Sequence, residues 1–547
     1  MSLHAGPILD IPELTVEIAR AAFPKGNIYM KMRDELGVFY DDKQFIDLFS
    51  HTGQPAIAPW RLALITIMQF AENLTDRQTA EAVRARIDWK YTLSLEMKNP
   101  GFHYSVLSEF RGRLIAGGRE ELLLQAMLDC FKEKDLLKQR GKQRTDSTHI
   151  LAVVRHLNQL ELVHETLRHA LNELAVQAPD WLKQQVTADW FDHYSRRTNH
   201  YLLPKKEDER QVWAERIGRD GLFLLEQVYR GGHHLDLVKL PAVEILRQVW
   251  LQNFYEDNEK VRLRQKKDQP PSAKRITSPH ELEARCSSKR DTMWTGYKVH
   301  LTETCDADSP NLITHVETRI STEPDHAATS MIHDQLTLKE CLPAEHFVDQ
   351  GYTSVEHLIR AREDYDLDLM GAIPNNNSWQ ARQQGYDSQH FAIDWDKQIA
   401  VCPQNHTSCS WTQAKTRSQR PVIKIKFRRK HCNACLKLDL CTSNKEKRRT
   451  LTVLAPQSHF EAQQEARHRQ QTTEFKDAFK LRAGVEGTMS QAAYTLGARQ
   501  SRYRGMTKTH LHHLGIAAAI NLLRIIDWLN DVPRATTPKS HFALLAA

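Results

Sequence analysis

The sequence predicts a mixed α/β fold, in which a sheet core is joined to a helical N-terminal domain and carries two insertions. Helical periodicity dominates residues 55–137 and 155–255, whereas residues 296–320 alternate apolar and polar side chains as an antiparallel hairpin does. At 547 residues the chain is too long for a single hydrophobic core. Its composition, 41% hydrophobic and 26% charged, is that of a globular protein.

A helical domain is expected over residues 1–140. Short apolar-periodic runs separated by polar turns predict its helices, and Thr75 with Gln78 has the pattern of a capping box. Ser105 is expected to cap the next helix. Such helices are typical both of a helix-turn-helix unit that binds DNA and of small bundles that do not. In the first case one helix offers three side chains to a DNA groove: Ser108, Arg111 and Arg113.

The sheet core is expected from three separated pieces, residues 141–154, 291–374 and 476–530. The first is the strand-like run QRTDSTHIL, and the second holds the hairpin and a strand–helix–strand run that passes through HFVD. The third is helical and ends in the apolar run LGIAAAINLLRII. Because that run is short and is interrupted by Asn521 and Arg524, it predicts a buried core helix and no membrane span.

Two insertions separate these pieces. Residues 155–290 are expected to form a helical insertion with a linker, residues 375–475 a basic insertion, and residues 531–547 a tail; insertions into surface loops cost little. Residues 401–450 contain thirteen Lys and Arg against two Asp and Glu, a net charge of +11, so the rest of the chain carries −4 of the total of +7. A field this concentrated favours a polyanion such as DNA over a merely solvated loop. The expected phosphate contacts are Lys424, Lys426, Arg428, Arg429 and Lys430.

The cysteines predict a reducing compartment and a metal site. Nine cysteines and a start that lacks a basic and apolar leader indicate the cytoplasm. Within the basic insertion, a C-x₂₉-C-x₂-C-x₅-C spacing favours a structural Zn²⁺ site. His406 and Cys409 are alternative ligands, and free thiols or a disulfide are the alternatives to zinc. The expected ligands are Cys402, Cys432, Cys435 and Cys441.

Acidic residues in three distant segments have the chemistry that phosphodiester cleavage needs. Asp146 lies inside the first core strand, where an unpaired carboxylate is costly, and Asp349 ends a later strand in FVDQGYTS. Glu486 lies on a helix in LRAGVEGTMSQ. Carboxylates that share two Mg²⁺ ions can activate a nucleophile and stabilise the leaving oxygen. Asp349 can instead cap the helix that follows it. Asp325 is a rival for the second acid, but we favour Asp349 because Asp325 has the sequence pattern of a helix cap.

The helix around Glu486 has unusual neighbours. Arg482, one turn earlier, can balance the carboxylate or contact a phosphate. Gly484 and Gly487 flank the acid although each glycine weakens a helix by about 1 kcal/mol. Glycine at these places predicts the close approach of another backbone or of a nucleic acid. The expected apolar stripe of this helix is Val485, Met489, Ala492 and Leu496.

Taken in order, TDSTHI, WTGYKVHLTETCD, FVDQGYTS and LRAGVEGTMSQ with a following SRYRG resemble the DDE-type transposases of bacterial insertion sequences, over about residues 55–530. The resemblance implies a ribonuclease H-like core in which Asp146, Asp349 and Glu486 bind two Mg²⁺ ions, with Mn²⁺ as a substitute. It also implies that the N-terminal domain binds the terminal repeats of the element. The implied reactions are DNA cleavage and strand transfer on double-stranded element ends and target, by a homodimer or larger assembly.

One part of the family pattern is not matched. Related transposases often carry Tyr-x₂-Arg-x₃-Glu-x₆-Lys around the third acid; here Arg482 and Glu486 match, but Phe479 and Ala493 stand in the Tyr and Lys places. The stacking and phosphate-clamping roles of those two residues are therefore in question. The nearby GARQSRYRGMTK is expected to supply positive charge instead, through Arg499, Arg502, Tyr503 and Arg504.

The sequence therefore predicts a transposase of the cytoplasm, associated with the nucleoid and with no membrane partner. One alternative is a DNA-binding regulator, or an inactive transposase relic, that lacks catalysis. Another is a nuclease of the ribonuclease H-like fold that cuts DNA without joining ends.

Overall fold

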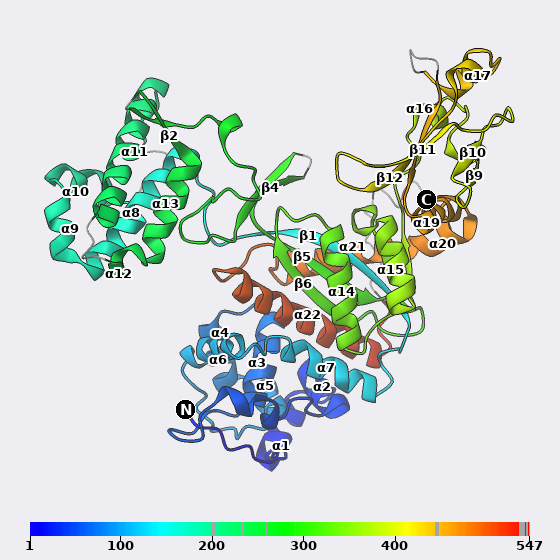
Figure 1. Ribbon diagram of the computed structural model, residues 1–547. Coiled ribbons are helices and arrows are strands. Elements are labelled where there is room, and N and C mark those ends of the chain that lie inside the picture. The colour runs from blue at the N-terminus through cyan, green and yellow to red at the C-terminus, as the bar shows by residue number, and fades with distance from the viewer. Residues whose placement is uncertain are drawn as a thin grey trace.

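A curled mixed sheet lies at the centre of the structure (Figure 1). The computed structural model describes residues 1–197, 203–230, 235–258, 260–289, 291–443, 448–534, 542 and 545. The strand order is β4-β5-β1-β7-β8, and β6 also pairs with β5. The pairs β5–β4, β5–β6 and β5–β1 are antiparallel, whereas β7 is parallel to β1 and to β8. The strands are β1 (Lys142–Leu151), β4 (Arg285–Lys289), β5 (Thr292–Thr304), β6 (Ile313–Ile320), β7 (Glu345–Val348) and β8 (Asp368–Gly371).

This arrangement confirms the predicted α/β class and is consistent with a ribonuclease H-like core beside a helical N-terminal region. Helices α14 (His326–Leu338) and α15 (Val355–Tyr365) contact the sheet through β6 and β8. Asp349 and a short 3₁₀ turn connect β7 to α15, so the chain passes from strand to helix at the acid that the sequence singles out.

The long helix α22 (Met506–Leu529) lies between the sheet and the N-terminal helices (Figure 1). Its apolar residues are buried in one hydrophobic core that also contains side chains of the sheet and of the N-terminal domain. Asn521, buried within it, accepts from the Ile313 N–H at 2.7 Å and donates to the Ile313 carbonyl at 2.8 Å, so its amide pairs with the backbone of β6. The prediction of a buried core helix is confirmed. No helix in the described ranges is long and apolar enough to cross a membrane.

The N-terminal domain is helical, as predicted. Thr75 and Gln78 form the expected capping box at the start of α4. The prediction for Ser105 is wrong: Tyr104 is the N-cap of α6 and makes no side-chain capping bond, while the Ser105 hydroxyl bonds the His103 ring at 2.9 Å. The helices are α1 (Glu13–Ala22), α2 (Ile28–Leu36), α3 (Pro59–Ala71), α4 (Asp76–Ala85), α5 (Ile87–Thr92), α6 (Ser105–Ala116) and α7 (Leu122–Glu133).

The first insertion is a helical unit that projects from the sheet and has its own hydrophobic core (Figure 1). The polar stretch expected to be a linker begins with a hairpin, β2 (Phe254–Asp257) and β3 (Lys260–Leu263), and ends in β4. The hairpin forms because Phe254 and Val261 pack against the helices. The helices are α8 (Gln159–Gln177), α9 (Pro179–Gln185), α10 (Ala188–Tyr194), α11 (Glu207–Arg230), α12 (Leu235–Val238) and α13 (Pro241–Asn253).

The second insertion contains a small unit, residues 379–455, which we call the basic lobe; it stands off the opposite end of the sheet (Figure 1). Strands β11, β12 and β13 pair antiparallel in that order, and β9 pairs with β10. Of the predicted tail, the structure describes residues 531–534, 542 and 545. The elements of the lobe are α16 (Trp379–Arg382), β9 (Ala392–Asp394), β10 (Ile399–Val401), β11 (Ser410–Lys415), β12 (Pro421–Lys426), α17 (Arg429–Asn433), α18 (Leu438–Cys441) and β13 (Thr450–Leu454).

After the lobe the chain returns to the sheet through α19 (Gln457–Arg469) and α20 (Thr473–Phe479). A 3₁₀ turn at Lys480–Gly484 leads into α21 (Val485–Ser490), and a π-helical turn at Gln491–Thr495 follows. The helical stretch predicted here therefore exists but changes its winding on either side of Glu486. The predicted apolar stripe, Val485, Met489, Ala492 and Leu496, is buried.

Candidate active site

Two of the candidate acids lie where the pairing of β1 with β7 ends, Asp146 within β1 and Asp349 just after β7. The parallel pairing of β1 with β7 ends with Thr145 opposite Val348, so the next residue on each strand is Asp146 and Asp349, respectively. Neighbouring strands lie about 4.8 Å apart, so this register sets the two acids side by side on adjacent stretches of chain. Burial raises the pKa of the Asp146 carboxyl above its ordinary value, and the negative charge of Asp349 adds to that rise.

The third acid is linked to the first by an arginine. Arg482 places Nη1 3.3 Å from Asp146 Oδ2 and Nη2 3.1 Å from Glu486 Oε1. The guanidinium therefore bridges a carboxylate on β1 and a carboxylate on α21. The Glu486 side chain is 65% exposed, whereas the Asp146 side chain is 22% exposed, so the site opens to solvent on the helix side.

The acids are near one another but are not preassembled around an ion. No three His, Cys, Asp or Glu side chains in the described ranges form a group that could hold a metal as they stand. The donors nevertheless have the right chemistry for Mg²⁺, which prefers carboxylate oxygens. Arg482 already places positive charge between Asp146 and Glu486, so the two acids lie where a cation is accommodated.

Of the two roles that the sequence left open for Asp349, the structure contains the cap. Its Oδ1 accepts from the Gln350 N–H at 2.8 Å, which caps the 3₁₀ turn, and the side chain is exposed. Its rival Asp325 occupies the N-cap position of α14 without a side-chain capping bond. Instead, Lys298 donates to Asp325 at 2.8 Å and Ser147 at 3.2 Å. Although burial opposes it, the bond from Lys298 lowers the pKa of Asp325, so this acid is already neutralised by a lysine.

A buried ionic network holds α21 against the sheet, and the sequence reasoning missed it. Glu303 of β5 is fully buried, 2.6 Å from Arg144 of β1 and 2.7 Å from Arg524 of α22. Thr488 of α21 also donates to Glu303, at 2.5 Å. Arg144 in turn donates to the Leu481 carbonyl at 2.7 Å. The strand with Asp146 and the helix with Glu486 thus share one set of charge-assisted bonds.

This network explains one of the two glycines beside Glu486. A Cβ on Gly484 would lie 1.9 Å from Nη1 of Arg144, whereas a Cβ on Gly487 would meet nothing within 4 Å. The predicted close approach at Gly484 is therefore made by an arginine side chain. Gly487 faces open space.

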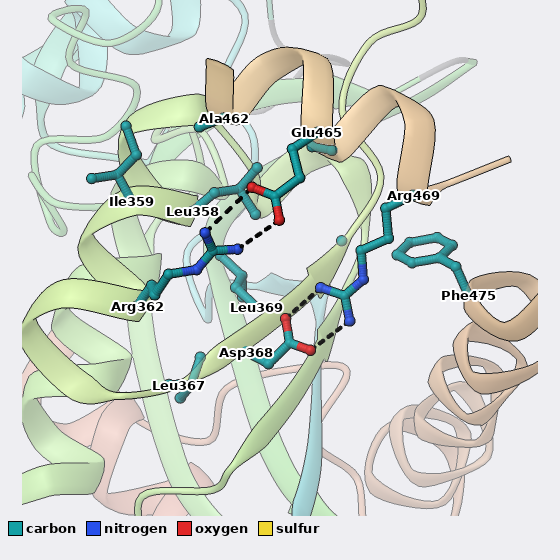
Figure 2. Close-up of a pocket in the computed structure, with 12 residues that line it drawn as sticks. Leu358, Ile359, Arg362, Leu367, Asp368, Leu369, Ala462, Glu465, Arg469 and Phe475 are labelled. Atoms are coloured by element: carbon teal, nitrogen blue, oxygen red, sulfur yellow. Dashed lines mark hydrogen bonds and ion pairs between the residues drawn. The ribbon is translucent and has the colours of Figure 1, made fainter. Parts of the chain in front are cut away.

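A second set of ion pairs fixes the helix that leads into the site (Figure 2). Arg469 of α19 donates to both oxygens of Asp368 on β8, at 2.6 and 2.5 Å. Arg362 of α15 donates to both oxygens of Glu465, at 3.3 and 3.2 Å. These pairs flank a small cavity and join α19 to the sheet and α15. Because α20 and Arg482 follow α19 in the chain, these ion pairs also fix the start of the segment that carries Glu486.

Comparison with protein families gives two matches. The model of a transposase DDE domain matches residues 401–526, which include α21 and Glu486. The model of a transposase domain designated DUF772 matches residues 17–113, which form most of the N-terminal helices. Together the two matches support a DDE-type transposase of an insertion sequence. No curated protein and no solved structure matches it.

The two residues that depart from the transposase motif, Phe479 and Ala493, pack within the protein. Phe479 stacks on Phe475 with ring centroids 5.4 Å apart and 14° between planes, and the Arg482 guanidinium lies 6.0 Å from the Phe479 ring. Ala493 is buried. The π-helical turn instead exposes Tyr494, whose ring lies 5.4 Å from the Arg499 guanidinium.

Several residues predicted to contact DNA hold the protein together instead. Arg111 is 5% exposed and pairs with Asp76 at 2.6 Å, and Arg113 donates to the Leu48 carbonyl at 3.0 Å. Neither guanidinium is free for a DNA groove in this conformation, whereas Ser108 is exposed. The sequence alone does not show these contacts, because it does not distinguish an arginine exposed on a helix from one that pairs with another segment of the protein.

Residues 499–503, after α21, also make contacts within the protein. Arg499 donates to Thr148 Oγ1 at 3.0 Å and to the His149 carbonyl at 2.8 Å. Arg502 donates to the Leu74 carbonyl at 2.7 Å, and the Tyr503 ring lies 5.3 Å from the Arg111 guanidinium. These residues join β1 and the N-terminal domain to the segment before α22, while Arg504 is exposed.

The basic lobe does present cations. Lys424, Arg428, Arg429 and Lys430 are exposed and Lys426 is half-buried. The four cysteines of the predicted zinc pattern line one cavity in this lobe, next to His406 and His431, whereas Cys409 is exposed outside it.

Proposed function

We propose that this transposase binds the terminal repeats of its element, cleaves the DNA with Mg²⁺ and transfers the freed strand to a target. The observation that carries the proposal is the register of β1 and β7, which sets Asp146 beside Asp349, with Glu486 tied to Asp146 through Arg482. The match to a transposase DDE domain supports the same reaction class.

Asp146, Asp349 and Glu486 would hold the ions. Bound divalent ions supply a water of lowered pKa and stabilise charge on the attacking and leaving oxygens. Asp146 and Asp349 approach from the sheet and Glu486 from α21, so the network around Glu303 sets the distance between the two sides. Arg482 lies on the same side of the site as Glu486. When the ions bind the carboxylates, its guanidinium would be released to pair with a non-bridging phosphate oxygen.

The chemistry divides into two displacements at phosphorus. In the first, water attacks the phosphodiester at the element end, the bond to the 3′ oxygen breaks, and a 3′-OH and a 5′-phosphate result. In the second, that 3′-OH attacks a target phosphodiester, and the target's own 3′ oxygen leaves. Both displacements need one nucleophile, one leaving oxygen and the same carboxylates, so a single site can perform both.

The DNA is proposed to cross the basic lobe as well as the acids. Exposed Lys424, Arg428, Arg429 and Lys430 provide charge for phosphate contacts, each of which strengthens the dependence of binding on salt. Two element ends must meet one target, so we propose a homodimer or larger assembly on DNA. Binding of this kind places the protein with the nucleoid.

The test uses the purified chain, a labelled element end and Mg²⁺ or Mn²⁺. Asp349→Asn is expected to abolish cleavage while binding to the end remains within a few-fold of the unaltered chain. Glu363→Gln, which removes an exposed carboxylate from α15, is the matched control and is expected to cleave normally. Full cleavage by Asp349→Asn would overturn the assignment.

The product pattern separates the alternatives. Tight binding without cleavage in either metal would identify a regulator or inactive relic. Cleavage without any joined product, in a reaction that contains target DNA, would identify a nuclease. The proposed function requires both a cut end and an end joined to the target.

A further inference from the structure

The basic lobe contains a cavity whose lining is a set of metal-binding side chains. Its volume is small, and most of its lining comes from three stretches of chain: the turn after β10, the α17 region and α18. The family match covers this part of the chain but assigns no metal to it. The potential ligands around the cavity are Cys402, Cys432, Cys435, Cys441, His406 and His431.

The turn at Cys402 is shaped to present a sulfur. The Cys402 N–H donates to the His406 carbonyl at 2.9 Å, and the Asn405 N–H donates to the Cys402 carbonyl at 2.8 Å. The His406 N–H then points at Cys402 Sγ, 3.4 Å away. This contact and the turn around it fix the position of the Cys402 sulfur at the cavity. Asn405 adopts a left-handed φ of 59°, which a short turn of this kind requires.

The other three cysteines are held at fixed places by backbone bonds. The Cys435 N–H donates to the Cys432 carbonyl at 3.1 Å, which closes the Cys-x₂-Cys turn. The carbonyl of Cys441 accepts from Gln380 at 3.0 Å. A Cβ on Gly385 would lie 2.1 Å from the Leu440 carbonyl oxygen, so the end of α18 packs directly on the backbone before β9. The four cysteines thus come from separate stretches of chain that line one cavity.

The lobe also lacks a large core of its own. Among its described residues the hydrophobic cluster of the lobe contains seven buried side chains, a small core for a unit of this length. Small units with few buried side chains are commonly stabilised by a metal or by disulfides. All four cysteines are free thiols, and Cys402, Cys432 and Cys441 pack against this core. Nδ1 of His431 is buried without a hydrogen-bond partner in the described structure, which marks the cavity as incompletely satisfied.

We propose that Cys402, Cys432, Cys435 and Cys441 bind one structural Zn²⁺ ion in this cavity. Each thiol loses a proton on binding, so four protons are released and the four thiolates complete a tetrahedral site. Because the cysteines do not form a preassembled group, binding requires their sulfurs to move together. Buried Arg449, which also lines the cavity, offsets the negative charge that four thiolates leave.

The ion connects the core of the lobe to its basic surface. Arg428, Arg429 and Lys430 lie two to four residues before Cys432, so fixing Cys432 and Cys435 also restricts the direction of these exposed cations. This consequence rests on the proposed function, because it concerns the binding of DNA. Zinc content and DNA cleavage are measured separately, so one can fail without the other.

The experiment measures metal in the reduced full-length chain by mass spectrometry, after dialysis against Zn²⁺ and removal of loose metal. One zinc per chain is expected in the unaltered chain and in Cys409→Ser, the matched control in the same segment. Cys432→Ser with Cys435→Ser is expected to lose it. Co²⁺ in place of Zn²⁺ is expected to give the absorption bands of a tetrahedral four-sulfur site.

Three results would overturn the proposal. One is the absence of zinc from the unaltered chain under these conditions. Another is full zinc retention by the Cys432→Ser, Cys435→Ser chain. The last is loss of zinc from His406→Ala, which would assign a mixed site in place of four sulfurs. Asp349→Asn should retain its zinc while losing cleavage, which keeps this test apart from that of the proposed function.

Discussion

The two glycines beside Glu486 allow a matched test of how the site is positioned. Both are helical and two positions or fewer from the acid, but only Gly484 faces a neighbour: its substituted Cβ would lie 1.9 Å from Arg144 Nη1. Arg144 cannot simply move aside, because it is paired with buried Glu303 at 2.6 Å and bonded to the Leu481 carbonyl at 2.7 Å. Gly484→Ala must therefore strain the helix or break part of the network.

The expected cost follows from those contacts. Overpacking a filled site costs about 1–3 kcal/mol, and breaking a buried ion pair outright costs about 3–5 kcal/mol. Because Arg144 can keep part of its pairing, we expect Gly484→Ala to cost about 2 kcal/mol. Gly487→Ala meets open space and should stabilise the helix by about 0.5–1 kcal/mol. The two substitutions are thus expected to have opposite signs.

Hydrogen exchange of α21 and β1, followed by mass spectrometry, reports this local stability. A loss of about 2 kcal/mol makes exchange about 30-fold faster in Gly484→Ala. In Gly487→Ala exchange should be unchanged or slower. Cleavage by Gly484→Ala should fall with the stability of α21, while zinc content and the helical insertion stay unaffected. Equal exchange rates in the two variants would refute the reasoning about Arg144.

The remaining predictions concern charge. Glu303→Gln should lower the local stability of β5 and α22, measured by hydrogen exchange, by about 3 kcal/mol. The control Glu323→Gln removes a more exposed partner of Arg319 and should lower local stability by less than about 1 kcal/mol. Asp146 has a raised pKa in the folded chain, so its ionisation opposes folding. The stability of the folded chain therefore falls as the pH rises from the ordinary carboxyl pKa through the raised one. Asp146→Asn should remove this loss, and the variant should have a higher melting temperature than the unaltered chain at neutral pH without metal. Arg469→Ala should lower the stability of the folded chain by about 1 kcal/mol. It should also slow cleavage more than Arg362→Ala does, because the bonds of Arg469 to Asp368 are shorter than those of Arg362 to Glu465. Equal cleavage rates in the two variants would contradict this. Arg428→Ala should reduce the salt dependence of DNA binding by about one counterion, whereas Arg111→Ala should lower the melting temperature and leave the salt slope unchanged.

Local patterns predicted the elements that depend on local sequence. The alternation in β5 and β6, the apolar run of α22 and the capping box at Thr75 all appear where expected. The polar stretch after α13 was predicted to be a linker, because the packing of Phe254 and Val261 on distant helices leaves no local signal.

Contacts between distant segments also determine the candidate site, and the sequence does not show them. Asp146 and Asp349 could be selected because each belongs to a strand-like run, but their adjacency depends on the pairing of strands about 200 residues apart in sequence. Glu303 was invisible for the same reason: its three partners lie on β1, α21 and α22. Arg111 was misjudged because sequence shows its charge but not the Asp76 carboxylate that buries it.

The central claim is that Asp146, Asp349 and Glu486 share divalent ions on DNA. Crystals of the chain with an element end and Mn²⁺ would test it through the anomalous scattering of the ions. We predict manganese peaks within bonding distance of all three carboxylates, with Arg482 turned from Asp146 toward a phosphate. Manganese bound elsewhere, with Arg482 still bridging Asp146 and Glu486, would contradict the account.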